Sequence, residues 1–412
     1  MYGRIKSTKL LHNVADYEVD HHDMWKEVLE AEPGSLEEEG AAKKLANFYL
    51  LKNSEKIQHD GRDKALWSER YTEASESLYG NINREVAGAL ITGELSIIMQ
   101  TAVRPEHEGV KQEVIDVLKS VLGPEAETNA EASGLSRERL EGITNALFES
   151  SKEIIDPIAS LEHEGPFHPT QVREIFKGIV EQLSAQDDLW SMWTVENGDG
   201  SQLKINAKER KIIVPDGRSP IESKEELLAL AMHEIGVHAR RSVNGERVDE
   251  SLRNGLSGYL DFEEGTGIFV EYLITGQLPT KAVDRYVDIA LAQGMGGGLS
   301  REQLIDLAVK RENIRTSIKG GDEQKIEADA KTHVNRIFRG GDGRQHKDSE
   351  GAISQAVFVK DMVYFAGFRI VADYFNEQMD RGRTAEEVLS YILSGKFDPT
   401  NQRHEEYISQ NS

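Results

Sequence analysis

The pattern of apolar and polar positions divides the chain into a helical first part, a short region with strand character and a second helical part. Up to about residue 160, apolar residues recur three and four positions apart among charged ones, as in INREVAGALITGELSIIMQTAV, which predicts amphipathic helices. Two polar stretches, EAETNAEASGLSRERLEG and HEGPFHP, interrupt this pattern. We interpret them as surface connections, because small and polar residues favour loops.

Beyond about residue 187 the apolar period changes to two. Leu203 and Ile205 alternate with polar residues, and Ile212 to Val214 follow after a charged turn. Asn197-Gly198 is a strong signal for a tight turn between strands, and PDG ends the region. The pattern predicts a small antiparallel sheet of two or three strands.

Two further helices are expected after the sheet. Ser223 and Glu226 form an S-x-x-E capping pattern before LLALAMHEIGVHARR, which predicts a helix that ends near Asn244-Gly245. A second helix is expected from near Phe262 to Gly276, and helices continue to about residue 393 around the polar loop GGDGRQHKDSEG.

These elements together predict a mainly α fold with a small antiparallel sheet (α+β). We divide the chain into a helical N-terminal region at 1–160, a catalytic region at 161–395 with a helical C-terminal part, and a tail at 396–412.

Composition narrows the chemistry. The net charge of −23 repels phosphate backbones, so nucleic acid is not an expected partner. No apolar run is long enough to cross a bilayer, and the start lacks the apolar stretch of a secretory signal, so we expect a cytoplasmic protein without a membrane partner. Because the chain has no cysteine, any metal must be held by His, Asp, Glu or water.

The segment His233-Glu234-Ile-Gly-Val-His238 reads H-E-x-x-x-H, one residue longer than the metalloprotease motif H-E-x-x-H. In a regular α-helix, residue i+5 lies about 140° from residue i, so both imidazoles would not meet one ion. We therefore expect a bulged helix with a single π-type turn, which Gly236 makes easier. The pattern predicts Zn²⁺ at His233 and His238, with Glu234 as the base that takes a proton from water.

The motif alone is weak, because two His residues at this spacing also arise by chance. Three neighbouring features strengthen it. Its helix is strongly apolar, where His and Glu are costly to bury; a small sheet precedes it; and a helix with acidic residues follows it. Together they are typical of a zincin-like metallopeptidase architecture.

A third ligand is expected from the second helix, which opens with FEEGTG. Glu264 lies far enough after His238 to allow a loop and a returning helix, which would complete a two-His, one-Glu set. Glu271 shares a helical face with Glu264, so it is either a ligand itself or a partner of one. Glu263 is a candidate for orienting a ligand His.

The segments AMHEIGVHARRSVNG and DFEEGTGIFVEY resemble the QEGLA-motif family of HExxxH zinc peptidases, which includes the microtubule-associated tyrosine carboxypeptidases. The resemblance implies that His233, His238 and Glu264 bind zinc and that Glu234 is the base. The Gly-Leu-Ala of that family is Gly-Thr-Gly at 265–267 here. This departure keeps the ligand but changes the packing behind it.

The resemblance continues in RIFRG at 336–340 and FVKDMVY at 358–364. A carboxypeptidase must recognise a free carboxylate, which Arg binds bidentately. Arg336, Arg339 and Lys360 are therefore candidate substrate-binding residues. Tyr364 is a candidate donor to the oxyanion. Taken one at a time, each residue also fits a salt-bridge role on a helix surface.

The leading hypothesis is a zinc carboxypeptidase that removes a C-terminal residue from a peptide or protein substrate. One alternative is a catalytically silent binding or regulatory protein that keeps zinc for folding. Another is an endopeptidase or aminopeptidase on the same scaffold. The sequence pattern sets no oligomeric state.

Overall fold

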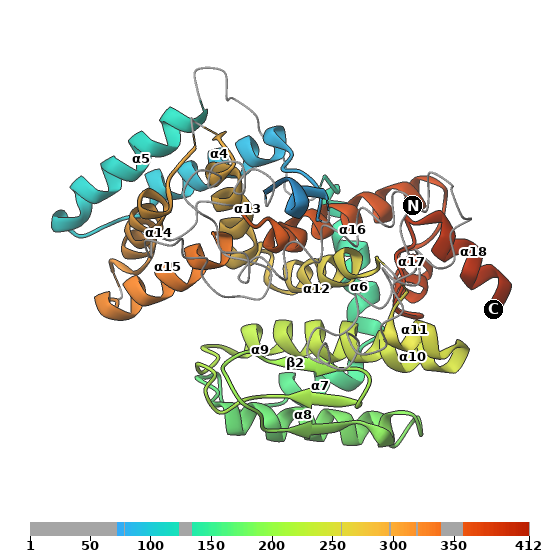
Figure 1. Ribbon diagram of the computed structural model, residues 1–412. Helices are drawn as coiled ribbons and strands as arrows, with labels where there is room; N and C mark the ends of the chain where they lie inside the picture. Colours follow the sequence, from blue (N-terminus) through green and yellow to red (C-terminus); the bar gives the residue numbers. More distant parts are fainter. Residues whose placement is uncertain are drawn as a thin grey trace, which may run out of the picture. The chain divides into compact units, whose positions relative to one another are not determined.

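The computed structural model describes residues 72–411, apart from residues 78, 123–133, 257, 296–297, 319 and 339–356. The described residues form two compact units (Figure 1). One unit contains residues 134–279 and 366–411, and the other contains residues 72–122 and 280–365. Each unit joins separated parts of the chain, so this division differs from the consecutive regions 1–160, 161–395 and 396–412.

The first unit carries the sheet and most of the candidate chemistry. Its elements, in chain order, are α6 (Arg137–Glu149), α7 (Lys152–Ala159), α8 (Pro169–Ser184), η4 (Trp190–Met192), β1 (Thr194–Glu196), β2 (Lys204–Asn206), β3 (Lys211–Ile213), α9 (Lys224–Ala231), η5 (Met232–Ala239), α10 (Arg240–Val248), α11 (Glu250–Asn254), α12 (Leu260–Thr275), α17 (Ala385–Ile392) and α18 (Gln402–Asn411).

Helices are the regular elements of the second unit, and its described residues contain no strand. Its labelled elements are α4 (Arg84–Gln100), η3 (Pro105–His107), α5 (Glu108–Leu122), α13 (Thr280–Ala292), α14 (Arg301–Thr316), α15 (Glu323–Ile337) and η7 (Lys360–Met362). Helix α16 (Val363–Asp380) begins among the residues of this unit and continues into those of the first. The expected mainly α fold with a small sheet is confirmed. Among the described helices, none has both the length and the apolar character that a bilayer crossing requires.

The three strands form a mixed sheet in the order β1–β3–β2. Strand β2 pairs antiparallel with β3, but β1 pairs parallel with β3. The expectation of a wholly antiparallel sheet is therefore wrong for one of the two strand pairs.

The local reason lies at Asn197 and Gly198, which do not form the expected hairpin turn. The Asn197 side-chain oxygen accepts hydrogen bonds from the backbone N–H groups of Gly198, at 2.8 Å, and of Asp216, at 3.0 Å. This ties the end of β1 to the segment after β3. The hairpin instead joins β2 to β3, where Arg210 adopts a positive φ of 54°.

The sheet lies next to the helix that carries the H-E-x-x-x-H motif. Helix α8 packs against β1, and strand β2, at one edge of this sheet, contacts η5 (Figure 1). Phe176 of α8, Val195 and Ile212 are buried. Because β2 is the last strand in the order β1–β3–β2, the strand next to η5 has one edge without a partner strand among the described residues.

Helices α9, η5 and α10 form one continuous helical run. Ser223 caps its start by accepting a hydrogen bond from Glu226 N–H at 3.1 Å, as expected. The run continues to Val248, beyond the expected end near Gly245. Gly245 is needed inside the helix because a side chain there would meet the Leu252 carbonyl oxygen at 2.3 Å. Helix α11, to which Leu252 belongs, was not expected from the sequence.

Helix α12 packs against η5 on one side and makes a close crossing with α16 on another. A side chain at Gly265 would meet the backbone carbonyl carbon of Gly367 at 2.1 Å. Phe269 packs on Phe375 and Phe368 of α16 at ring-centroid distances of 5.2 and 5.8 Å. The start of α12, which carries the acidic residues, is thus held between two helices.

Candidate metal centre

The segment from Met232 to Ala239 is a π-helix, η5. Its hydrogen bonds join residues five apart, so positions i and i+5 stack on one face rather than lying far apart around the axis. His233 and His238 occupy such a pair, and their ring centroids are 4.8 Å apart. The apolar neighbours Met232, Ile235 and Val237 are fully or almost fully buried, which anchors the wide turn against the core.

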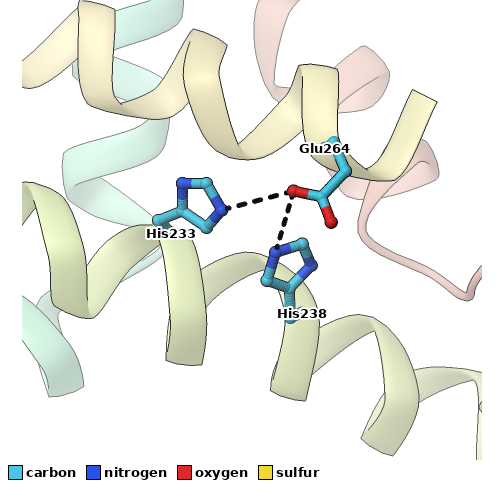
Figure 2. Close-up of side chains that lie close together, drawn as sticks. All are labelled: His233, His238 and Glu264. Atoms are coloured by element: carbon cyan, nitrogen blue, oxygen red, sulfur yellow. Dashed lines mark ion pairs between the residues drawn. The ribbon is translucent and has the colours of Figure 1, made fainter. Parts of the chain in front are cut away.

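Three side chains converge between η5 and α12 (Figure 2). One carboxylate oxygen of Glu264 lies 4.0 Å from His233 Nε2 and 3.9 Å from His238 Nε2. One potential ligand atom from each of the three residues lies within 4.8 Å of the ligand atoms of the other two. Among the described residues, this is the one group of three or more His and acidic side chains that could hold a metal ion. The structure thus brings together the three residues that the sequence predicted as ligands.

Each imidazole is oriented by a second carboxylate on its other nitrogen. His233 Nδ1 lies 2.5 Å from Glu271 Oε1, and His238 Nδ1 lies 2.8 Å from Glu263 Oε1. A carboxylate that accepts the Nδ1 proton leaves the Nε2 lone pair for a metal, as in many His-ligated sites. Glu271, one of the alternatives for the third ligand, is therefore placed as a partner of His233.

Glu263 belongs to a buried network of charges. Its carboxylate accepts a hydrogen bond from Arg241, and Lys396 Nζ lies 3.5 Å away. Arg241 is fully buried and also donates to the backbone carbonyls of Gly395, at 2.8 Å, and Phe397. Burial alone would raise the pKa of Glu263, but Arg241 and Lys396 hold it well below its usual range. Glu263 is thereby kept as an anion that accepts from His238.

The donor set fits a zinc ion. Two imidazole nitrogens and one carboxylate are the ligands of a common catalytic zinc site, at metal–ligand distances of about 2.0–2.2 Å. Ligand atoms around such a tetrahedral ion lie about 3.5 Å apart, close to the observed 3.9 and 4.0 Å. The group offers three potential protein ligands among the described residues, so a tetrahedral ion held by them would have a further position for water or substrate.

Negative charge surrounds the two imidazoles. Burial would lower the pKa of His233, but its hydrogen bond to Glu271 and the charges of Glu271, Glu234 and Glu264 raise it to about 9. Without an ion, the site therefore attracts a proton. The same carboxylates favour a divalent cation in its place.

Glu234 follows the first His on η5, at the same site. Burial raises the pKa of Glu234, His233 and His238 oppose that rise, and Glu264 adds to it. A raised pKa suits a group that must take up and then release a proton near neutral pH. The role of base predicted for Glu234 stays a prediction.

Close packing between η5 and α12 depends on a departure from the family pattern. A side chain at Gly267 would meet His233 Cε1 at 2.5 Å and Nε2 at 2.6 Å. Thr266 is buried and hydrogen-bonds through Oγ1 to the Phe262 carbonyl at 2.7 Å. The Gly-Thr-Gly segment thus lets His233 approach the backbone of α12 directly.

The residues predicted to bind substrate lie in the second unit or outside the described residues. Arg336 donates two hydrogen bonds to Asp361, at 2.7 and 2.9 Å. Lys360 lies over the Tyr79 ring, and Arg285 lies over the Tyr364 ring. Arg339 lies outside the described residues. Substrate binding by Arg336, Arg339 and Lys360 stays a prediction. So does the role of Tyr364 as a hydrogen-bond donor to the oxyanion.

Sequence reasoning did not identify Arg241, Lys396 or Arg218. The sequence position of Arg241 could have indicated its link to the motif, since it lies three residues after His238 and so falls on a nearby helical face. Lys396 comes from a distant turn, and Arg218 comes from the loop after β3. No local pattern linked either residue to the motif.

Comparison with known proteins supports the resemblance seen in the motifs. A family model described as microtubule-associated tyrosine carboxypeptidase matches residues 110–404. No curated protein and no solved structure matches the chain.

Proposed function

Since the chain belongs to the family of microtubule-associated tyrosine carboxypeptidases, we propose that it is a zinc-dependent carboxypeptidase that removes the C-terminal residue of a peptide or protein. The observation that carries the proposal is the convergence of His233, His238 and Glu264, whose potential ligand atoms lie within 4.8 Å of one another. Each ligand His has a carboxylate partner on Nδ1.

The proposed ligands would hold zinc with an open position. When bound, zinc polarises a carbonyl oxygen and lowers the pKa of water to about 7. Glu271 and Glu263 fix the ring orientation of the two ligand His residues through hydrogen bonds of 2.5 and 2.8 Å. Arg241 in turn fixes Glu263.

Glu234 is the proposed proton carrier. Its carboxylate takes a proton from the attacking water and passes it to the amine nitrogen of the leaving residue. Burial favours the neutral form of this carboxylate, so proton uptake is made easier.

A zincin-like architecture is supported by the arrangement of elements around the motif. Strand β2 contacts η5 and has an edge without a partner strand among the described residues. An extended substrate could add to that edge through main-chain hydrogen bonds. Helix α12 supplies the carboxylate ligand from the other side.

A catalytically silent zinc protein is the competing proposal. Structural zinc sites are usually closed by four protein ligands, whereas three ligands form the group among the described residues. A purely structural site also has no use for a half-buried carboxylate such as Glu234. Both observations favour catalysis.

The direct test compares the wild-type protein with Glu234→Gln, using a peptide that ends in tyrosine. Zinc content is measured for both proteins. We expect the wild type to release free tyrosine, and the variant to bind zinc but to lose at least about a hundredfold in turnover. Undiminished turnover in the variant would exclude Glu234 as the base. Cleavage at an internal or N-terminal bond would instead support an endopeptidase or aminopeptidase.

A further inference from the structure

Arg218 is held in a well-anchored loop between β3 and α9. Arg173 of α8 donates to the Val214 carbonyl at 2.7 Å and to Asp216 at 2.5 Å. The other end of the loop is fixed at Ile221, which forms a β-bridge with Phe167. The backbone N–H of Arg218 itself donates to the Pro215 carbonyl at 3.2 Å. The backbone position of Arg218 is therefore set by the fold.

One nitrogen of the Arg218 guanidinium lacks a hydrogen-bond acceptor. Its Nε is buried and has no hydrogen-bond partner, and the side chain forms no ion pair or hydrogen bond with the described residues of the first unit. Other arginines of the unit are committed: Arg241 to Glu263, Arg173 to Asp216, and Arg210 to Glu246. A buried N–H without a partner costs free energy until a ligand supplies an acceptor.

Arg218 also lies within electrostatic range of the metal centre. Burial lowers the pKa of Arg218, while the charges of Glu234 and Glu271 raise it. Neither carboxylate comes within ion-pair distance of it in the described structure. Arg218 therefore lies near enough to Glu234 and Glu271 to feel their charges without forming an ion pair with either, and its side chain is half-buried rather than enclosed.

We propose that Arg218 is the substrate-binding residue that receives the α-carboxylate of the C-terminal residue to be removed. This inference rests on the proposed function and adds a recognition group to it. A planar guanidinium binds a carboxylate bidentately. The terminal carboxylate lies about one residue, roughly 3.8 Å, beyond the bond to be cut. An unpaired guanidinium within electrostatic reach of Glu234 is the kind of group that such a carboxylate needs.

The inference differs from the sequence-based prediction, which named Arg336, Arg339 and Lys360. Arg336 is already paired bidentately with Asp361, and Asp361 also lies 3.7 Å from Arg285. A substrate carboxylate would have to displace Asp361 to reach that guanidinium. Arg218 has no such competitor among the described residues.

The test is a binding experiment on the zinc-loaded Glu234→Gln protein, which separates recognition from cleavage. Two peptides are compared that are identical except at the C-terminus, where one has a free tyrosine carboxylate and the other a tyrosine amide. Arg218→Met, Arg218→Lys, Arg336→Met and the exposed control Arg137→Met are each added to Glu234→Gln. Zinc content and thermal unfolding are recorded for every protein.

We expect the Glu234→Gln protein to bind the free acid at least about tenfold more tightly than the amide, since a charge-assisted bidentate pair is lost in the amide. Arg218→Met should bring this ratio close to one, and Arg218→Lys should restore part of it. Arg137→Met and Arg336→Met should leave the ratio unchanged. If Arg218→Met fails to fold, Arg218→Lys against Arg218→Gln gives the same comparison.

An equal affinity of the Glu234→Gln protein for the two peptides would overturn the proposal. So would a preference for the acid that survives Arg218→Met or disappears in Arg336→Met. Hydrolysis by the wild type is measured separately. A wild type that cleaves neither peptide, combined with a preference for the acid that depends on Arg218, would refute the proposed function while the carboxylate site stands.

Discussion

His238 Nδ1 and Glu263 Oε1 lie 2.8 Å apart, in a pair whose side chains are almost entirely buried. Arg241 contacts the other carboxylate oxygen of Glu263, and Lys396 lies near the oxygen that pairs with His238, so both compensate its negative charge. A carboxylate held in this way keeps the His238 proton on Nδ1 and leaves Nε2 free to bind a cation. The proposed metal site would therefore depend on residues well outside the motif.

We expect Glu263→Gln to weaken zinc binding about 10- to 100-fold, the usual cost of losing a carboxylate that orients a ligand His. The Gln side chain cannot hold His238 through a charge-assisted bond, and Arg241 is left without its anion. Zinc affinity is measured by competition with a chelator of known affinity. Glu250→Gln, which removes the exposed partner of Arg253, is the control. An unchanged affinity in Glu263→Gln would show that Glu263 does not support the site.

Part of this site could be read from the sequence, because its central residues lie close together along the chain. The spacing of His233 and His238 indicated a helix wider than an α-helix, and Glu264 came from the next long helix. The residues that complete the site come from separate segments. Lys396, for example, lies beyond α17, so only the folded chain brings it to Glu263.

The strand pairing shows a different limit. Alternation at Leu203 and Ile205 and the apolar run from Ile212 to Val214 indicated strands at β2 and β3, since such patterns report burial of side chains. They do not report which strands are neighbours. The side chain of Asn197 binds the backbone of Asp216, and this long-range contact overrides the local turn signal that favoured a hairpin. The extension of α10 past Gly245 has a similar cause, because Gly245 is required by its contact with Leu252.

Gly267→Ala tests the close approach of His233 to α12. The added methyl group would lie 2.5 Å from His233 Cε1, so the imidazole or the helix must move. We expect zinc affinity to fall at least about tenfold, because a ligand displaced by a few tenths of an ångström no longer fits the tetrahedral set. Gly178→Ala is the matched control, since nothing lies within 4 Å of its added methyl. It should be neutral or stabilise by about 0.5–1 kcal/mol. Equal zinc affinities for the two variants would contradict this prediction.

Gly265→Ala tests the crossing of α12 with α16. Its methyl group would lie 2.1 Å from the Gly367 carbonyl carbon, which is backbone and cannot rotate away. We expect a loss of about 1–3 kcal/mol in the free energy of unfolding, from overpacking, measured as a lower urea midpoint. The neighbouring Glu264 should also shift, which would lower zinc affinity. Gly142→Ala on α6, with open space around it, should show neither effect.

Arg311→Met tests a buried ionic cluster in the second unit. Arg311 is almost fully buried and donates two hydrogen bonds to Asp288, at 2.6 and 2.7 Å, and one to Glu94 at 3.2 Å. Its removal leaves buried carboxylates uncompensated, which typically costs about 3–5 kcal/mol. We expect faster hydrogen–deuterium exchange in α13 and α14. Lys310→Met, which removes a pair of largely exposed ion pairs on the same helix, should cost less than about 1 kcal/mol.

The pH dependence of the metal-free protein offers a test of the charges around His233. The folded-state pKa of His233 is raised to about 9, against about 6.5 in an unfolded chain. A raised pKa means that the folded state holds the proton more tightly, so the stabilisation is fully present below about pH 6.5 and is lost as the pH rises through about 9. In the presence of a chelator, the wild type should therefore be more stable than His233→Gln at pH 6, and the difference should shrink steadily up to pH 9.

Zinc affinity should change in the opposite direction, rising over the same range, because the ion must displace this proton. Both quantities come from thermal unfolding and chelator competition at a series of pH values, with His168→Gln, a surface His at the start of α8, as the control. A stability difference that does not vary between pH 6 and 9 would show that Glu271 does not hold a proton on His233.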